Sequence, residues 1–476
     1  MFNTKSFDVV SFNSELSAAR LETSANVQTT EIIYAANDTQ TTETRSVGIQ
    51  TTNEQKADAQ VDYDRLAEFL KKVTPGILEA LDEASSAFDD YNPNVSETSS
   101  TTVELLKKIN TLREIETSSF QNSVHSIKVS DLSWSTVGGT LAVGLSHICH
   151  ATWCDHLSTI QLYNLTTEDD VTDVPAKTLE TNGCVTTLCY HPTEPSILAA
   201  GLFNWDVFIW NLRNDDSVVP MHVCSHGDSV SQVCWRPRSV SDVTLLLSSS
   251  IDGYILIHKV MANFTTVQLH KRFKIAKERN PIENARPRSS GGTRERAAEA
   301  GLCITSFDFS LKHPSIFIVG TLCGGIYKCS LDSVTPIEED ATLIDPVIDE
   351  YERHGGSVTS IKCSPLRNLF VSSGTDKEIR IYNLDEHVSQ QTISVDDTVV
   401  GLTWMIGNQD VLAAYGAGTC VKFYNVANGK PVTHAKVEVT GKEDISSLRV
   451  NSKRDVLAIG DIRANVEIWK FPRQLF

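Results

Sequence analysis

The sequence predicts an all-β fold, a seven-bladed β-propeller over residues 119–476, because one strand pattern recurs seven times at regular spacing. Each unit closes on a strand in which apolar residues alternate with others. These closing strands are IQLYNL (160–165), VFIWNL (207–212), ILIHKV (255–260), IYKCSL (326–331), IRIYNL (379–384), VKFYNV (421–426) and VEIWKF (466–471). Their spacing is 42–53 residues, with one step of 71 where a loop is inserted. Such a period suits a propeller blade of four strands.

Two further strands precede each closing strand. The opening strands begin at a β-branched residue: VSDLSW (129–134), VTTLCY (185–190), VSQVCW (230–235), ITSFDF (304–309), VTSIKC (358–363), VVGLTW (399–404) and ISSLRV (445–450). The middle strands are rich in small residues, as in LAVGL (141–145), ILAAGL (197–202), FIVGT (317–321), FVSSGT (370–375) and VLAIGD (456–461). Prolines 192, 237 and 365 follow opening strands, and Asp252-Gly253 suits a hairpin tip.

The seventh unit ends on its closing strand near the C-terminus, so its outer position lacks a strand. We expect residues just before 129 to fill that position, so that both ends of the chain close the ring. Closure would leave no long sheet edge exposed to other chains.

The first 118 residues differ in composition from the repeats. Residues 1–100 carry 17 acidic and 7 basic side chains, within a chain of net charge −18. This balance disfavours nucleic acid and anionic membranes as partners. The start, MFNTKSFDVVSFNSE, lacks the apolar core of a signal peptide, and no run of about 18 apolar residues could span a bilayer. Most of the 11 cysteines lie in strand-like runs, which favours reduced, buried thiols.

Residues 1–60 are predicted to be a disordered tail that carries three Gln-Thr-Thr steps. Thr, Val and Ile favour extended backbone, so each step can add as a strand to a partner's sheet edge. Steps 12 and 10 residues apart would space partners by roughly 33–40 Å. The alternative is chance recurrence in a tail of biased composition. The steps are Gln28-Thr29-Thr30, Gln40-Thr41-Thr42 and, within the fullest motif, Gly48-Ile49-Gln50-Thr51-Thr52.

Residues 61–118 show apolar residues at helical spacing. The segment 62–73 places Leu66, Phe69, Leu70 and Val73 on one face. After a break at Thr74-Pro75-Gly76, a second helix would carry Ile77, Leu78 and Leu81. A third helical pattern spans 101–116, with Val103, Leu106, Ile109 and Leu112 or Ile115 inward. The first helix could pack on its own propeller; we favour docking in a groove of a separate subunit.

Sites for chemistry are few. His147, Cys149, His150, Cys154 and His156 form a metal-like cluster, but their spacing fits no zinc template, so we expect no bound metal. Neither a phosphate-binding loop nor a nucleophile elbow occurs, so we expect no enzyme activity and no cofactor. The insert 271–300 holds nine basic and four acidic residues, which suits a solvated loop or a contact with an acidic partner.

Trp205 is a candidate contact residue for a partner. It lies in Phe203-Asn204-Trp205-Asp206, a turn between strands of the second unit, where tips usually carry small polar residues. A large aromatic there is either an interface anchor or a side chain folded back on a neighbouring blade.

The repeat resembles a WD-repeat propeller with a degenerate Trp-Asp pair, seen as Trp210-Asn211, Tyr382-Asn383 and Trp469-Lys470. The segments HGDSVSQVCWRP (226–237), GTLCGGIYKCSL (320–331) and HGGSVTSIKCSPLRNLFVSSGTDKEIRIYNL (354–384) are similar to WD-repeat dynein intermediate chains. Within that family they resemble the smaller intermediate chain of cytoplasmic dynein 2, the motor of retrograde intraflagellar transport. The resemblance covers residues from about 46 to the C-terminus.

The resemblance implies a non-catalytic scaffold in the cytoplasm and cytoskeleton, at the cilium and its base. The Gln-Thr motif would bind the hub-type light chain, the helix after it the roadblock-type light chain, and the propeller the dynein 2 heavy chain, beside a second intermediate chain. The extra steps at Gln28 and Gln40 leave the number of light chains open, and the insertion around His150 has no family role.

Three alternatives compete with this interpretation. An intermediate chain of another dynein, cytoplasmic dynein 1 or axonemal, ranks second; for dynein 1 we would expect an initial charged coiled coil, and the first 20 residues show no heptads. A generic WD-repeat adaptor, such as a substrate receptor of a ubiquitin ligase, would not need tandem strand-addition motifs. A propeller hydrolase would need carboxylates that converge at the central channel.

Overall fold

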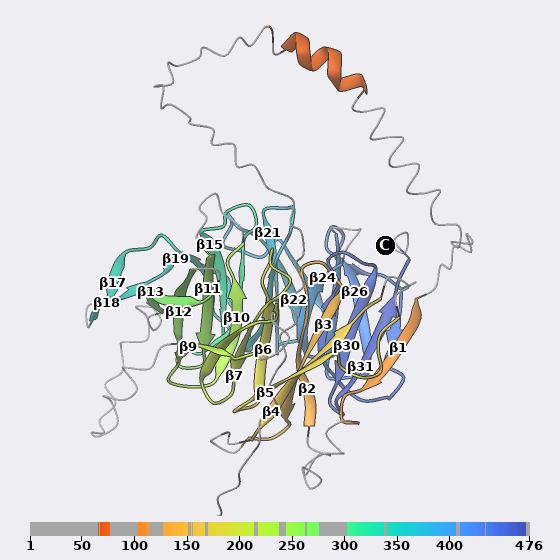
Figure 1. Cartoon of the computed structure of the whole chain (residues 1–476). Helices are drawn as coiled ribbons and strands as arrows, with labels where there is room; N and C mark the ends of the chain where they lie inside the picture. The colour runs from red at the N-terminus through yellow and green to blue at the C-terminus, as the bar shows by residue number, and fades with distance from the viewer. Residues whose placement is uncertain are drawn as a thin grey trace, which may run out of the picture. The chain divides into compact units, whose positions relative to one another are not determined.

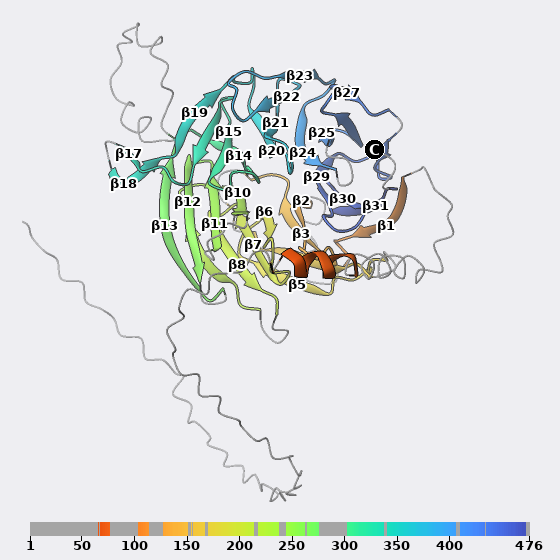
Figure 2. The ribbon, with the colours of Figure 1, turned by 90° about the horizontal axis from the view of Figure 1, so that it is seen from above.

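A computed structural model describes the chain in two separate units, which fall within residues 1–94 and 95–476. The described residues are 65, 67–76, 103–113, 127–150, 154, 156–166, 170–213, 218–237, 244–261, 264–275, 302–337, 340–405, 410–433 and 435–472. The first unit contributes a helix over 65–76, and the second is a seven-bladed propeller (Figures 1 and 2). Among the described helical residues, no segment is long and apolar enough to cross a membrane.

Each blade is built on an antiparallel sheet, and in blades one to six the strands follow chain order from the centre outward. Blade one comprises β2 (Ile127–Trp134), β3 (Thr140–His147), β4 (Ser158–Asn164) and β5 (Lys177–Thr181). Blade two comprises β6 (Val185–Tyr190), β7 (Ile197–Leu202), β8 (Asp206–Asn211) and β9 (Met221–Ser225). Blade three comprises β10 (Val230–Trp235), β11 (Thr244–Ser250), β12 (Tyr254–Met261) and β13 (Thr266–Lys274). Blade four comprises β14 (Ile304–Phe309), β15 (Ile316–Thr321), β16 (Ile326–Ser330) and β19 (Val347–Tyr351).

The remaining blades complete the ring. Blade five comprises β20 (Val358–Cys363), β21 (Leu369–Gly374), β22 (Glu378–Asn383) and β23 (Gln391–Ser394). Blade six comprises β24 (Val399–Trp404), β25 (Val411–Gly416), β26 (Cys420–Asn425) and β27 (Lys430–Pro431), with β28 (Val437–Glu438) also paired to β26. Blade seven comprises β29 (Ile445–Val450), β30 (Val456–Asp461), β31 (Asn465–Lys470) and β1 (Glu104–Asn110). The predicted fold class and the opening, middle and closing strands are confirmed.

Close contact between blades explains the two sequence patterns that recur. The inner strands of neighbouring blades contact one another around the centre (Figure 2). A Cβ at Gly201 in a middle strand would lie 2.4 Å from Cγ1 of Val230, which opens the next inner strand. A Cβ at Gly460 would likewise lie 2.5 Å from Cγ1 of Val129, across the seam between blades seven and one. The small residues of one blade thus make room for the β-branched residues of the next.

The ring closes through β1, which pairs antiparallel with β31 as the outer strand of blade seven. Closure by an N-terminal segment is therefore confirmed, but the helix expected over 101–116 is wrong, and a propeller boundary at 119 leaves out β1. The register shifts between Leu105 and Lys107, so one extra residue enters the strand. Such a bulge moves the alternation by one position. Leu106 and Ile109 can then both face the core at a spacing that imitates a helix.

A buried carboxylate anchors β1 in place. Glu467 of β31 is 1% exposed and faces Lys108 of β1, with 3.2 Å between Oε1 and Nζ. The Glu467 carboxylate also accepts hydrogen bonds from the backbone N–H and hydroxyl of Thr440 and from the indole of Trp469. Several partners offset the cost of burying a charge, whereas loss of one partner leaves part of its desolvation uncompensated.

The helix of the first unit extends further than expected. It continues through Thr74-Pro75-Gly76 to residue 76, so the predicted break after 73 falls within its last turn. The Thr74 hydroxyl donates to the Leu70 carbonyl at 2.6 Å, a bond that suits a helical turn. The second predicted helix, with Ile77, Leu78 and Leu81, lies outside the described residues.

Blade three is longer than the repeat predicts. A hairpin of β17 (Thr335–Ile337) and β18 (Asp340–Asp345) leaves blade four and pairs with β13, where Arg272 and Phe273 face Leu343 and Ile344. The hairpin covers the outer edge of β13, which would otherwise be open to pairing. The first four residues of the basic insert 271–300 belong to β13, and residues 276–300 lie outside the described part of the chain.

Replacing Lys108 with Met should lower the free energy of unfolding of the propeller by about 2 kcal/mol, because Glu467 loses a charged partner while it stays buried. Denaturant unfolding of the full chain measures this. Lys107→Met is the matched control: Lys107 lies 3.0 Å from Asp173, whose side chain is 60% exposed, so its loss should cost less than about 1 kcal/mol. Equal effects of the two variants would contradict the anchoring role of Glu467.

Candidate functional site

The sequence-predicted light-chain sites fall only partly within the described residues. All residues of the three Gln-Thr-Thr steps lie outside them, as does Leu66. On the helix over 65–76, Phe69 is 59% exposed and Leu70 is 51% exposed, while Val73 is half-buried. The helix therefore presents two large apolar side chains to solvent within its own unit.

Trp205 lies in the turn between β7 and β8, as the sequence predicts, and its side chain is half-buried. Its φ is +79°, in the left-handed region that residues other than glycine seldom occupy. The Trp205 N–H donates to the Leu202 carbonyl at 3.3 Å, and the Trp205 carbonyl accepts from the His226 N–H at 3.0 Å. Backbone bonds to Leu202 and to His226, which follows β9, thus hold the turn in a conformation that costs about 1–3 kcal/mol.

The neighbouring turn residue, Phe203, joins this turn to the insertion of blade one. Its ring stacks on the imidazole of His150, with centroids 4.1 Å apart. The Phe203 N–H donates to the Cys184 carbonyl at 2.8 Å. One face of the propeller carries the connections β3–β4, β5–β6 and β7–β8. They lie together because successive strands alternate in direction and because residues 182–184 form a short link between β5 and β6.

Only part of the metal-like cluster predicted from the sequence comes together in the structure. Side-chain atoms of His150, Cys154 and His156 converge with Cys184, which sequence reasoning missed because it lies 28 residues beyond His156. Cys184 directly precedes an inner strand, at the face of the propeller where the insertion also lies. That position is the feature of the sequence that could have indicated its place in the cluster. Cys149 is exposed and stands outside the group. His147 stacks on His156, with centroids 4.1 Å apart.

A second group with metal-ligating side chains, in blade five, serves the fold. Nδ1 of buried His354 lies 2.9 Å from an Asp376 oxygen, and its Nε2 lies 2.7 Å from the Ser372 hydroxyl. Burial lowers the pKa of His354 although Asp376 opposes this, so a neutral ring that donates from Nδ1 and accepts at Nε2 fits both contacts. Glu378, the third member, pairs with Arg380 at 2.7 Å. These bonds tie the link between β19 and β20 to β21 and to the β21–β22 turn.

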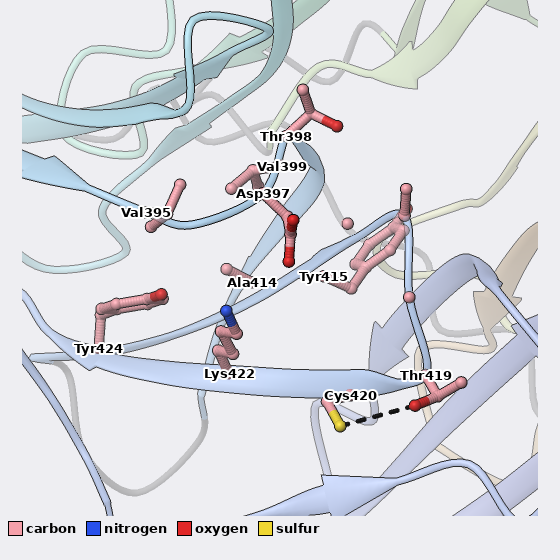
Figure 3. A pocket seen from close by; sticks show the side chains of 13 residues that line it. Val395, Asp397, Thr398, Val399, Ala414, Tyr415, Thr419, Cys420, Lys422 and Tyr424 are labelled. Carbon is pink, nitrogen blue, oxygen red and sulfur yellow. Dashed lines mark hydrogen bonds between the residues drawn. The ribbon is translucent and has the colours of Figure 1, made fainter. Parts of the chain in front are cut away.

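A pocket of about 270 Å³ lies in blade six, lined by the link between β23 and β24 and by β25, β26 and the turn that joins them (Figure 3). Asp397 and Lys422 reach it, and Tyr415 forms part of its wall. Burial raises the pKa of Tyr415 to about 12, which keeps its hydroxyl protonated. Asp397 is the one carboxylate among the residues described as lining this pocket.

Inner strands are linked by a partly buried ion pair that sequence reasoning also missed. Asp131 of blade one accepts from the Arg449 guanidinium of blade seven at 2.9 Å and from the Leu188 N–H of blade two at 2.9 Å. The Asp131 carboxylate holds the pKa of Arg449 above its usual range. Arg449 also donates to the Leu132 carbonyl at 2.9 Å. The Asp131 side chain thus connects blade one to blades seven and two.

Comparisons with known proteins agree with this architecture. A family model described as WD domain, G-beta repeat, matches residues 346–383, which span β19 to β22. Cytoplasmic dynein 2 intermediate chain 2 of Homo sapiens is 27% identical over 427 residues, which cover 87% of this chain and 77% of that protein. Its Mus musculus counterpart is 28% identical over 431 residues, with coverage of 87% and 76%.

A more distant relative comes from a motile flagellum. The 78 kDa intermediate chain of the flagellar outer arm dynein of Chlamydomonas reinhardtii is 21% identical over 308 residues, which cover 63% of this chain and 43% of that protein. The match to dynein 2 chains is both higher in identity and longer. In architecture and in sequence, the chain is a WD-repeat β-propeller protein that resembles the dynein intermediate chains, as its motifs predict.

Proposed function

We propose that this chain is a non-catalytic intermediate chain of a cytoplasmic dynein 2 motor, which joins light chains to the heavy chain for retrograde intraflagellar transport and cilium assembly. The observation that carries the proposal is the match to dynein 2 intermediate chains over 87% of this chain. An axonemal role is the weaker alternative, because the flagellar relative matches over 63%. The chain would act in the cytoplasm and at the ciliary base, beside a second intermediate chain.

The proposed division of labour follows the order of the segments along the chain. Hub-type light chains would bind the Gln-Thr-Thr steps, a roadblock-type light chain the helix over 65–76, and the heavy chain the propeller. The helix ends at residue 76 and β1 begins at Glu104. The 27 residues between them can span at most about 90 Å. A light chain on the helix would therefore be tethered within that distance of the start of β1.

The propeller suits the role of a rigid clamp. Blade seven is completed by the pairing of β1 with β31, and blades are joined by polar contacts such as the one between Asp131 and Arg449. A partner that binds its surface would lose little free energy in ordering it. Trp205 is a candidate anchor, since an aromatic side chain on a conformationally fixed turn is pre-organised for contact.

Replacing Gln50 and Thr51 with Ala should weaken hub-type light-chain binding more than the same change at Gln40 and Thr41. The fullest motif, from Gly48 to Thr52, is the proposed principal site, and the other steps assist it by raising effective concentration. Calorimetry with a 20–60 peptide measures both variants. Absence of binding by the unmodified peptide would refute the tandem docking sites.

Changing Phe69 and Leu70 to Asp should release the roadblock-type light chain, because burial of each side chain is worth roughly 1.5–3 kcal/mol. Co-purification of the tagged full chain followed by mass spectrometry detects this, with heavy chain and hub-type light chain retained. Arg65→Ala, on the same helix, is a control that should keep both light chains. Melting of the propeller should be unchanged; a lower melting temperature would instead show that the helix packs on its own propeller.

Trp205→Ala should weaken heavy-chain co-precipitation by about tenfold or more, as expected for an interface anchor, and should reduce retrograde ciliary transport. Val137→Ala is the matched control, since Val137 is 59% exposed in the turn between β2 and β3, at the opposite face of the propeller. Circular dichroism would verify that both variants stay folded. Normal heavy-chain binding by a folded Trp205→Ala protein would remove Trp205 from the contact surface.

A further inference from the structure

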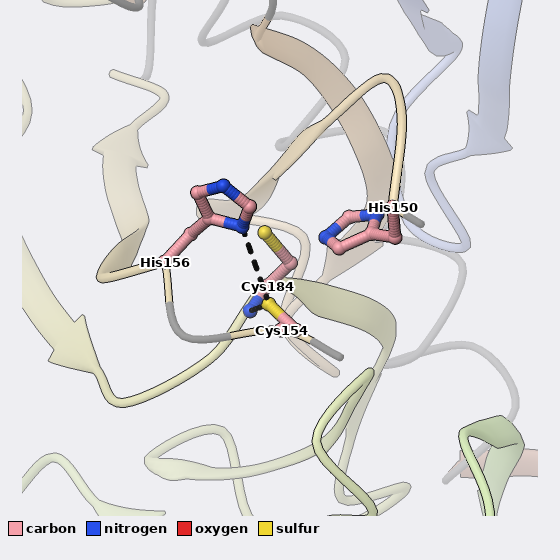
Figure 4. A group of neighbouring side chains, drawn as sticks. All are labelled: His150, Cys154, His156 and Cys184. Carbon is pink, nitrogen blue, oxygen red and sulfur yellow. Dashed lines mark hydrogen bonds between the residues drawn. The ribbon is translucent and has the colours of Figure 1, made fainter. Parts of the chain in front are cut away.

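We infer that His150, Cys154, His156 and Cys184 form a structural site for a thiophilic divalent cation, Zn²⁺, that ties blade one to blade two. One ligand atom from each of the four side chains lies within 4.8 Å of the other three. Figure 4 shows the two sulfurs between the two imidazole rings, with a nitrogen of each ring directed toward them. Two thiolates and two imidazoles are a donor set that zinc prefers.

The distances suit a tetrahedral ion. With Zn–S near 2.3 Å and Zn–N near 2.05 Å, tetrahedral geometry places ligand atoms about 3.4–3.8 Å apart. Cys154 Sγ already lies 3.7 Å from His156 Nδ1. The remaining pairs, at no more than 4.8 Å, need to close by about 1.4 Å at most.

Backbone N–H groups hold both sulfurs in place. The Cys184 N–H donates to Cys154 Sγ at 3.3 Å, and the His147 N–H donates to Cys184 Sγ at 3.3 Å. Hydrogen bonds to coordinating atoms fix their orientation and are a general feature of metal sites. The Cys184 carbonyl accepts from Phe203 at 2.8 Å, so Cys184 is held by its nitrogen, oxygen and sulfur together.

A buried polar atom without a partner points to the same conclusion. Nε2 of His150 is buried and has no hydrogen-bond partner among the described residues. A buried donor or acceptor left unsatisfied costs about 1–3 kcal/mol. Stacking on Phe203 accounts for the faces of the His150 ring but not for its nitrogens. Metal coordination by this ring would remove that cost.

Four protein ligands would fill the tetrahedral shell, so the ion would have no open position for a substrate. Its effect would be to join the β3–β4 insertion to the link between β5 and β6 and, through Phe203, to the β7–β8 turn. This inference is independent of the proposed dynein function. The earlier expectation of no metal rested on spacing within the insertion alone, which omits Cys184.

The test is the metal content of the purified full chain after gel filtration. Elemental mass spectrometry should find about one zinc per chain in the wild type and in Cys149→Ser. The Cys154→Ser and Cys184→Ser variants should lose the zinc. Cys149 is the matched control, because it lies in the same insertion but outside the group. Loss of zinc from Cys149→Ser equal to that from Cys184→Ser, or a wild type without zinc, would overturn the inference.

A second measurement on unmodified protein guards against variants that misfold. Co²⁺ added to the metal-free chain should give the absorption of a tetrahedral ion with thiolate charge-transfer bands, and Zn²⁺ should displace it. Octahedral Co²⁺ spectra without thiolate bands would refute the site. A Cys154–Cys184 disulfide in unreduced, metal-free protein would also refute the site if the protein takes up no Co²⁺ once that disulfide has been reduced.

Discussion

The pairing of β1 with β31 is the contact on which the rest of this structure depends. A propeller that ended at β31 would expose one edge of blade seven and leave Glu467 buried without Lys108. With β1 in place, blade seven has the four strands that the other blades show. The Arg449–Asp131 pair and the contact of Gly460 with Val129 then lock the seam between blades seven and one. Outer strand pairing and inner polar bonds act on the same joint.

This joint also bears on function. β1 is the strand of the propeller that lies nearest along the chain to the tail and its helix. A force applied to the tail would therefore act on β1, which is paired along its length to β31 and anchored by a buried charge. For a chain that joins light chains to a motor, such a connection would transmit force into the ring rather than into a loop. The zinc site inferred between blades one and two would brace the blades that follow the seam.

Much of the propeller could be predicted from the sequence because each blade repeats the same physical solution. Alternation marks the half-buried strands, and a small residue such as Gly201 marks where Val230 of the next blade must fit. The prediction failed at β1, where a bulge near Leu106 changes the alternation and imitates a helix. It also missed Cys184 and the Arg449–Asp131 pair, because three-dimensional convergence of residues far apart in sequence leaves no local pattern. The Gln-Thr-Thr steps remain predictions.

Backbone amide hydrogen exchange of the full chain tests the closure of the ring most directly. If β1 is the fourth strand of blade seven, the amides of residues 104–110 that bond to β31 should exchange as slowly as those of β30 and β31, because they open only with the blade. Exchange of this segment as fast as that of free chain, while β31 stays protected, would contradict closure by β1.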